Sequence, residues 1–216
     1  MLTTLVFDLD GTLADTPAGI AATIAAVLAE MGYAPPAADA VLPMIGLPLE
    51  DTFRSFLPPD RWDAVPDCVI RYREIYADTA IPASELFPGV EETLRRCRAA
   101  GYRMGIATTK ISPVAEAVLS HCGILPLFDA VFGSDRTSLP KPHPELALKL
   151  LAELGSDPAQ AMVVGDTSYD ILMGKGAGAR TCAVTYGVHP RHQLEAAGPD
   201  YIIDRFSDLE SIIGLP

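Results

Sequence analysis

Short runs of apolar residues recur along most of this chain, and each is followed by a stretch with helical periodicity. Runs that are apolar on both faces are typical of strands in a parallel sheet that is covered by helices on both sides. We expect strands over residues 2–7, 102–107, 130–133, 161–164, 181–185 and 201–203. Helices are expected over residues 90–100, 113–122, 144–154, 169–177 and 206–213. The alternation therefore predicts an α/β fold around a parallel sheet.

One long segment interrupts this alternation. Between residues 17 and 80 the pattern is helical throughout, with helices expected over residues 17–31, 36–44, 49–56 and 61–78. Thr16 and Pro17 suit the N-cap and the first turn of the first of these helices. We therefore predict two domains, an α/β core made of residues 1–14 and 84–216 and an inserted helical cap made of residues 15–83.

The cap is expected to act as a lid. Because it is inserted between two parts of the core, it can close over the edge of the sheet, with hinges near residue 15 and residues 81–87. Its aromatic residues follow the helical pattern, so we expect them to pack inside the cap rather than to stack on a ligand. These residues are Trp62, Tyr72 and Tyr76.

Composition and charge narrow the possible partners. The chain has 216 residues, of which 49% are hydrophobic and 20% are charged, and this composition excludes an intrinsically disordered chain. It carries 16 Lys and Arg against 28 Asp and Glu, a formal net charge of −12. A field of this sign repels nucleic acid and anionic membrane surfaces. It leaves room for a small anion that is held by a local site.

The sequence shows no targeting signal, and the spacing of its cysteines suggests no metal or redox site. No segment reaches the about 18 consecutive apolar residues that cross a membrane, and the first residues lack the features of a signal peptide. The four cysteines have neither the spacing of a zinc site nor that of a redox motif, so we expect buried thiols. We therefore expect a cytoplasmic protein.

The strongest chemical feature follows the first predicted strand, in the sequence Asp8-Leu9-Asp10-Gly11-Thr12. Active sites of α/β sheets form at the carboxyl ends of the strands. Two carboxylates that are two residues apart in an extended segment lie on the same side, so one can attack as a nucleophile while the other transfers a proton. Gly11 allows the backbone to turn tightly behind them. The alternative is an ordinary acidic turn, which the position after the first strand disfavours.

A second pair of carboxylates, Asp166 and Asp170, follows the strand expected over residues 161–164. Carboxylate oxygens are the ligands that Mg²⁺ prefers in proteins. Taken alone this pattern is weak, because Asp166 could simply cap the next helix. Together with Asp8 and Asp10 it predicts a magnesium site at the strand ends.

Two further positions fit an anion site. Thr108, with Thr109 and Lys110, follows the strand expected over residues 102–107 and offers a hydroxyl and backbone N–H groups. Lys141 lies between two prolines just before a helix, where its ammonium could neutralise a phosphate and a carboxylate together. Each of these residues, taken alone, is more typical of a helix cap or a solvated surface.

Together these motifs resemble the four motifs of the haloacid dehalogenase-like hydrolase superfamily, in the same order and over almost the whole chain. The helical insertion is similar to the four-helix cap of one of its subfamilies. The resemblance therefore implies an α/β fold with a Rossmann-like parallel sheet core and an inserted four-helix cap. Within that subfamily, the phosphoglycolate phosphatase-like group is nearest, on the segments 46–49, 141–144, 186–187 and 204–207.

The resemblance implies a Mg²⁺-dependent phosphatase. In such an enzyme Asp8 attacks phosphorus to give an aspartyl-phosphate, and Asp10 protonates the leaving alcohol and then activates water. Mg²⁺ would be held by Asp8, by the carbonyl of Asp10 and by Asp166, with Asp170 supporting it directly or through water. The phosphate would be bound by Thr108 and Lys141, together with Gly11, Thr12 and Thr109.

Several alternatives stay open. Dehalogenases lack the second carboxylate and P-type ATPases carry a lysine at the position of Leu9, so both are disfavoured. A pyrophosphatase or a 5′-nucleotidase would use the same motifs. A β-phosphoglucomutase would be expected to carry a histidine early in the cap, but residues 19–30 contain none, so a phosphomutase is disfavoured. A catalytically silent binding protein is disfavoured because no motif residue is missing. The expected partner is a small phosphorylated metabolite, phosphoglycolate first, and the expected assembly is a monomer or a homodimer.

Overall fold

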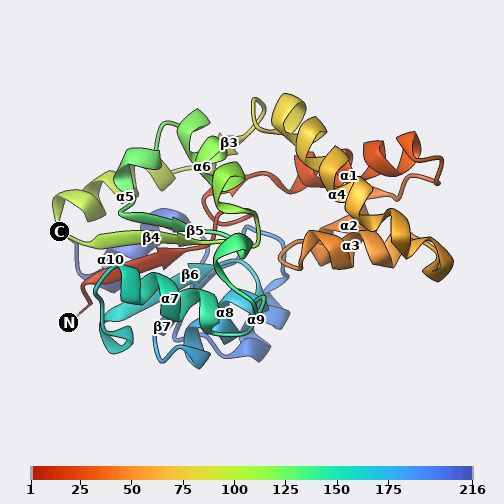
Figure 1. Ribbon diagram of the computed structural model, residues 1–216. Helices are drawn as coiled ribbons and strands as arrows, with labels where there is room; N and C mark the ends of the chain where they lie inside the picture. Colours follow the sequence, from red (N-terminus) through yellow and green to blue (C-terminus); the bar gives the residue numbers. More distant parts are fainter. Residues whose placement is uncertain (1, 216) are drawn as a thin grey trace.

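Six parallel strands form the central sheet of the computed structural model, which describes residues 2–215 (Figure 1). In sheet order they are β5 (Ala130–Phe132), β4 (Arg103–Ala107), β1 (Thr4–Phe7), β6 (Ala161–Gly165), β7 (Arg180–Val184) and β8 (Tyr201–Ile203). Counted along the chain this order is 3-2-1-4-5-6, the arrangement of a Rossmann fold. The predicted α/β class with a Rossmann-like sheet is confirmed.

Both faces of the sheet are apolar because successive side chains of a strand enter different cores. In β1, Leu5 and Phe7 pack into one core and Val6 into the other. The first core contains α5 (Val90–Ala99), α6 (Ser112–His121) and α10 (Leu209–Ile213), whereas the second contains α7 (Glu145–Glu153) and α8 (Ser168–Gly176). Helix α9 (Arg191–Ala197) packs against α8. Single turns join these elements at η4 (Leu125–Leu127), η5 (Ser134–Arg136), η6 (Pro158–Gln160) and η7 (Phe206–Asp208).

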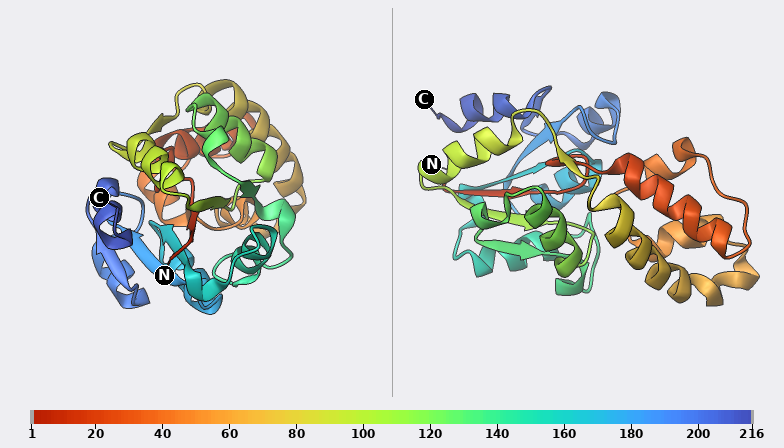
Figure 2. Two further views of the ribbon diagram at one scale, coloured as in Figure 1. Left: turned by 90° about the vertical axis from the view of Figure 1, so that its left-hand side faces the viewer. Right: turned by 90° about the horizontal axis from the view of Figure 1, so that it is seen from above.

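Residues 17–80 form a group of helices beyond the carboxyl ends of the strands, opposite both chain termini (Figures 1 and 2). The group consists of α1 (Pro17–Glu30), α2 (Ala38–Val41), η1 (Leu42–Met44), α3 (Leu49–Phe56), η2 (Pro59–Ala64), α4 (Val65–Ile75) and the π-helical turn η3 (Tyr76–Ala80). The chain enters and leaves it through an antiparallel pair of short strands, β2 (Ala14–Asp15) and β3 (Glu85–Leu86). We refer to residues 17–80 as the cap; the exact domain limits 15–83 stay a prediction.

Two local expectations about the cap are corrected by the structure. Thr16 occupies the N-cap position of α1, but its hydroxyl makes no capping bond and donates instead to Asp10. Trp62 is 48% exposed, so the expectation that it packs inside the cap is wrong, whereas Tyr72 and Tyr76 are buried. Pro17 begins α1 as expected.

Two other properties bear on the expected chemistry. All four cysteines are free thiols, with Cys68, Cys97 and Cys182 buried and Cys122 half-buried. Within residues 2–215, none of the helices combines the length and the apolar composition that crossing a bilayer requires.

Candidate active site

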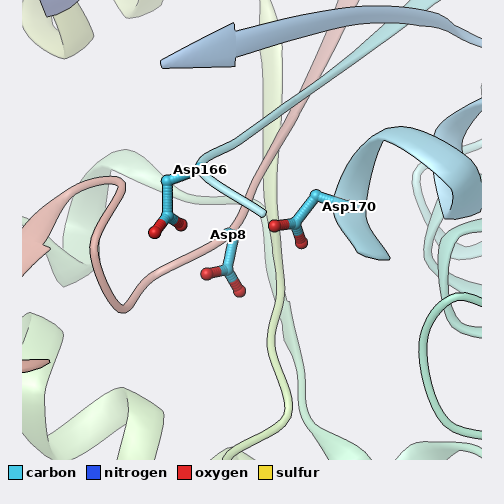
Figure 3. A group of neighbouring side chains, drawn as sticks. All are labelled: Asp8, Asp166 and Asp170. Atoms are coloured by element: carbon cyan, nitrogen blue, oxygen red, sulfur yellow. The ribbon is translucent and has the colours of Figure 1, made fainter. Parts of the chain in front are cut away.

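The strand order reverses between β1 and β6, and the candidate site lies at the carboxyl ends of these two strands. In open α/β sheets ligands bind in the crevice at such a reversal. Asp8 follows β1 directly and Asp166 follows β6 directly, while Asp170 lies in the first turn of α8. Figure 3 shows the carboxylates of these three residues facing one another. The fold therefore brings together two motifs that are far apart in the sequence.

The three carboxylates form a tight buried group. One oxygen from each of Asp8, Asp166 and Asp170 lies within 4.8 Å of the others. Burial raises the pKa of Asp8 well above its ordinary value, and the charges of the neighbouring aspartates add to this effect while Lys141 opposes it. Burial, followed by repulsion from Asp170, raises the pKa of Asp166 to about 7. Burial and the repulsion between neighbouring carboxylates thus both oppose ionisation of this group.

Lys141 is the cation inside this group. Its Nζ lies 2.7 Å from Oδ1 of Asp8 and 2.6 Å from Oδ1 of Asp170. Burial acts to lower the pKa of Lys141, but the two carboxylates outweigh it and hold the pKa above its ordinary value. Lys141 is therefore a charged group that lies against two carboxylates, Asp8 and Asp170.

Hydrogen bonds fix the two carboxylates of the second motif. Asp166 accepts a bond from the Thr12 hydroxyl at 2.8 Å on Oδ1 and one from the Val188 N–H at 2.8 Å on Oδ2. Asp170 accepts bonds on Oδ2 from the Thr167 N–H at 3.1 Å and from its hydroxyl at 2.6 Å, in a capping box. Thr167 is therefore the N-cap of α8, which settles the alternative that Asp166 only caps that helix.

Glycines make room for Asp166. Gly11 has a φ of +79°, and a Cβ at this position would collide with the Asp166 carboxylate. A Cβ on Gly187 would collide with the same side chain. Glycine is thus required at both positions, at Gly11 for its backbone conformation as well.

Asp10 is held by residues that the sequence motifs do not include. Its Oδ1 accepts a hydrogen bond from the Thr16 hydroxyl at 2.5 Å and lies 2.9 Å from Nζ of Lys110. The side chain of Lys110 is only 10% exposed, and its Nζ lies 4.4 Å from the centroid of the Tyr76 ring in the cap. Burial acts to lower the pKa of Lys110, but Asp10 outweighs it and the pKa is raised. The position of Lys110 two residues after Thr108 was the available signal in the sequence.

A cavity of about 120 Å³ lies between the cap and the strand ends. From the core it is lined by Asp10, Thr108, Thr109, Lys110 and Lys141. The cap contributes mainly apolar side chains, together with Glu50 and Arg73. Of the predicted phosphate-binding residues, Thr108, Thr109 and Lys141 line this cavity. Gly11 and Thr12 do not, and the hydroxyl of Thr12 is bound to Asp166.

Comparison with known proteins matches residues 5–184 to the family described as haloacid dehalogenase-like hydrolase. The chain belongs to this family. It is 39% identical to a protein of Dickeya dadantii named "Probable phosphatase IndB". The match extends over 208 residues, which are 95% of this chain and 90% of that protein. Pyrophosphatase PpaX of Bacillus velezensis is 36% identical over 214 residues, 99% of this chain and 97% of that protein.

A solved structure agrees with this assignment. The crystal structure of a predicted phosphoglycolate phosphatase from Haemophilus somnus has a TM-score of 0.87 and 26% sequence identity, and the match covers 98% of each chain. The resemblance to the phosphoglycolate phosphatase-like group is therefore confirmed. Similar haloacid dehalogenase-like hydrolases are named as phosphatases and pyrophosphatases.

The donor set of this hydrolase fits a divalent cation. When they are ionised, Asp8, Asp166 and Asp170 carry three negative charges, and Lys141 compensates only one of them. A divalent ion would balance the remaining two. Buried carboxylate oxygens are hard ligands of the kind that Mg²⁺ prefers. The residues present therefore fit Mg²⁺ by chemistry and by charge.

Proposed function

We propose that this protein is a Mg²⁺-dependent phosphatase that hydrolyses small phosphomonoesters through an aspartyl-phosphate on Asp8. The observation that carries the proposal is the environment of Asp8. One oxygen is held by Lys141, whereas Oδ2 makes no hydrogen bond to any residue of the described part of the chain. A carboxylate that is oriented in this way, with one oxygen free, is suited to attack phosphorus. Membership in a hydrolase family with similar members named as phosphatases supports the proposal.

The first step transfers the phosphoryl group to the enzyme. Oδ2 of Asp8 forms a bond to phosphorus while the bond between phosphorus and the leaving oxygen breaks. Asp10 acts as the general acid and gives a proton from Oδ2 to the leaving oxygen. Its Oδ1 is held by Thr16 and Lys110, so the orientation of the acid is fixed before the substrate arrives.

The second step releases phosphate. Asp10, now ionised, takes a proton from a water molecule whose oxygen attacks phosphorus, and the bond from phosphorus to Asp8 breaks. The products are inorganic phosphate and the original Asp8 carboxylate, while the proton stays on Asp10 for the next cycle. A closed cap would limit access to this one water.

The remaining residues bind charge. Mg²⁺ would be held by Asp8, Asp166 and the carbonyl of Asp10, with Asp170 supporting it from α8. When bound, the ion supplies Lewis-acid stabilisation of the charge on the phosphoryl oxygens. Thr108, Thr109 and Lys141 line the cavity and would bind these oxygens from the protein side. Lys141 would also offset the repulsion between the phosphate and Asp8.

The substrate is expected to be small. The cavity of about 120 Å³ is well below the roughly 300–1,000 Å³ of sites for drug-sized ligands. A net charge of −12 opposes long polyanions at a distance. Phosphoglycolate is the first candidate. Pyrophosphate is the second, because of the similarity to Pyrophosphatase PpaX over nearly the full length of both chains.

A substrate and metal panel tests this proposal. We expect hydrolysis of 2-phosphoglycolate or pyrophosphate with Mg²⁺, loss of activity in EDTA and recovery with excess Mg²⁺. The kcat/KM should be at least about tenfold above that of a phosphopeptide, because a large substrate holds the cap open. Asp166→Ala should raise the Mg²⁺ concentration that gives half-maximal activity by about tenfold or more. The control is Asp60→Ala, which removes an exposed carboxylate of the cap and should leave this concentration unchanged. Full activity in EDTA would refute the metal assignment.

A further inference from the structure

The cavity carries three cationic side chains, and they differ in what they contact. Lys141 pairs with Asp8 and Asp170, and Lys110 pairs with Asp10. Arg73 on α4 is half-buried and lines the same cavity, yet its side chain makes no hydrogen bond or ion pair to any residue between 2 and 215. A guanidinium that lines a cavity without a partner of its own in the described chain is available to bind an anion from outside it.

The surroundings of Arg73 strengthen this argument. The cap side of the cavity is otherwise mainly apolar, with side chains such as Ile20, Ile24 and Val41. Apolar walls lower the local dielectric constant and increase the attraction between a guanidinium and an anion. By contrast, Arg71 on the same helix lies outside the cavity and pairs with Glu30 and Glu74 at the surface. On the same helix, Arg71 therefore has carboxylate partners within the described chain, whereas the side chain of Arg73 has none.

We propose that Arg73 binds a second anionic group of the substrate, a carboxylate or a terminal phosphoryl group, at the end away from the phosphoryl that reacts. This inference rests on the proposed function and adds the substrate class to it. A guanidinium donates two parallel hydrogen bonds to either kind of group. The core wall of the cavity holds Thr108 and Lys141 for one anion, and the cap wall holds Arg73 for the other. The preferred substrate is therefore a short molecule with an anion at each end.

Glu50 sharpens this specificity. It is the one carboxylate in the cavity lining that comes from the described cap residues, and it makes no ion pair with Arg73 or with any other residue of the described chain. A carboxylate at this wall repels an anionic group that lies elsewhere in the cavity. Among the described cap residues that line the cavity, Arg73 is therefore the charged group that attracts an anion.

The test compares matched pairs of substrates. Ethylene glycol monophosphate has a CH₂OH group where 2-phosphoglycolate has its carboxylate, and methyl phosphate lacks the second phosphoryl group of pyrophosphate. In the wild type we expect the anionic member of at least one pair to have the higher kcat/KM. Arg73→Gln should lower kcat/KM for that anionic substrate by about 10- to 100-fold, the effect of losing a charged hydrogen bond. The neutral member should change less than about threefold. The pair that responds identifies the second anion as carboxylate or phosphoryl.

Two further variants keep the test decisive. Arg73→Lys retains the charge and should recover part of the preference if Arg73→Gln proves unstable in a thermal melt. Arg71→Gln removes an arginine from the same helix outside the cavity and should leave the preference unchanged. An equal loss on both members of each pair, or no loss on either, would overturn the inference while hydrolysis by the wild type upholds the proposed function. If the wild type with Mg²⁺ hydrolyses none of the four substrates, the proposed function fails, and the inference fails with it.

Discussion

Asp10 depends on a lysine that lies outside the sequence motifs. Both Thr16 and Lys110 contact Oδ1 of Asp10, and no described residue donates a hydrogen bond to Oδ2. This arrangement leaves Oδ2 for the proton transfers that the proposed mechanism requires. Lys110 in turn packs over the Tyr76 ring, so Asp10 is linked to the cap through Lys110 and its cation–π contact.

Replacement of Lys110 tests this link. Lys110→Met keeps most of the apolar stem and removes the ammonium that orients Asp10. We expect kcat for an alkyl phosphate to fall by about 10- to 100-fold with little change in KM, because an alkoxide leaving group needs the proton from Asp10. In single-turnover measurements, phosphorylation by p-nitrophenyl phosphate should fall less, since its leaving group is stable without a proton.

The control for this variant is Lys149→Met, which removes an exposed lysine that pairs with Glu145. It should change neither rate. An equal loss on both leaving groups in Lys110→Met would mean that Lys110 acts on something other than the proton transfer. Unchanged rates would mean that Thr16 alone orients Asp10.

The sequence predicts which carboxylates meet, but not how they are held. Asp8 and Asp166 each follow a strand directly, so the adjacency of β1 and β6 brings them together. The contacts of Lys110 and Thr16 with Asp10 depend on the directions of side chains from separate loops. The same is true of the Val188 N–H that binds Asp166. No spacing rule in a single sequence encodes such contacts.

Among the elements, the strands of the sheet and most of the helices are predicted from the sequence, whereas β2, β3 and α9 are not. The six strands of the sheet are apolar on both faces, which makes them visible in the sequence. β2 and β3 have two residues each, which is too few to show a period, and the seven residues of α9 include only one buried side chain, Leu194. The expected helix over residues 61–78 is wrong at its start, because residues 59–64 form a 3₁₀ turn with a kink at Arg61. The change of period turns Trp62 toward solvent.

The loop that carries Lys110 is braced by η5, the turn that follows β5. Oδ1 of Asp135 accepts hydrogen bonds from the Ser112 N–H at 2.6 Å and from its hydroxyl at 2.8 Å, at the start of α6. The N–H of Ser134 donates to the carbonyl of Lys110 at 2.8 Å. Asp135 therefore caps α6 from outside the helix and fixes the end of the loop.

Replacement of the Asp135 carboxylate should change the stability of the fold in a pH-dependent way. Burial acts to raise the pKa of Asp135, but the hydrogen bonds from Ser112 outweigh it and lower the pKa below its ordinary value of 3.8. A carboxylate with a lowered pKa in the folded state stabilises the fold above its unfolded-state pKa, and the effect is lost as the pH falls through the folded-state pKa. Asp135→Asn should lower the free energy of unfolding by about 1 kcal/mol near neutral pH, with a smaller difference below about pH 4.

Urea unfolding at a series of pH values measures this difference. Asp60→Asn, a change at an exposed carboxylate with no hydrogen bond within residues 2–215, should show no loss of stability at any pH. The capping role of Asp135 would be contradicted if Asp135→Asn caused no loss of stability, or if the loss grew as the pH was lowered.

At the scale of the whole molecule, the proposed mechanism assigns the reaction to the core and the selection of the substrate to the cap. The core supplies the aspartates and Lys141 at the sheet edge, whereas the cap supplies the opposite wall of the cavity with Arg73. The net charge of −12 disfavours the approach of anions at a distance, so capture depends on the few cations inside the cavity. This arrangement favours small anionic esters that fit wholly between the two parts.

The central claim is that a phosphoryl group is attached to Asp8 during turnover. Asp10→Asn lacks the base for the second step, so with p-nitrophenyl phosphate and Mg²⁺ it should accumulate the intermediate. Intact-protein mass spectrometry after mixing should show one added phosphoryl group, and peptide mapping should place it on Asp8. The double variant Asp8→Asn/Asp10→Asn should show none. A phosphoryl group on another residue, or turnover by Asp10→Asn with no modified protein at any time, would contradict the account.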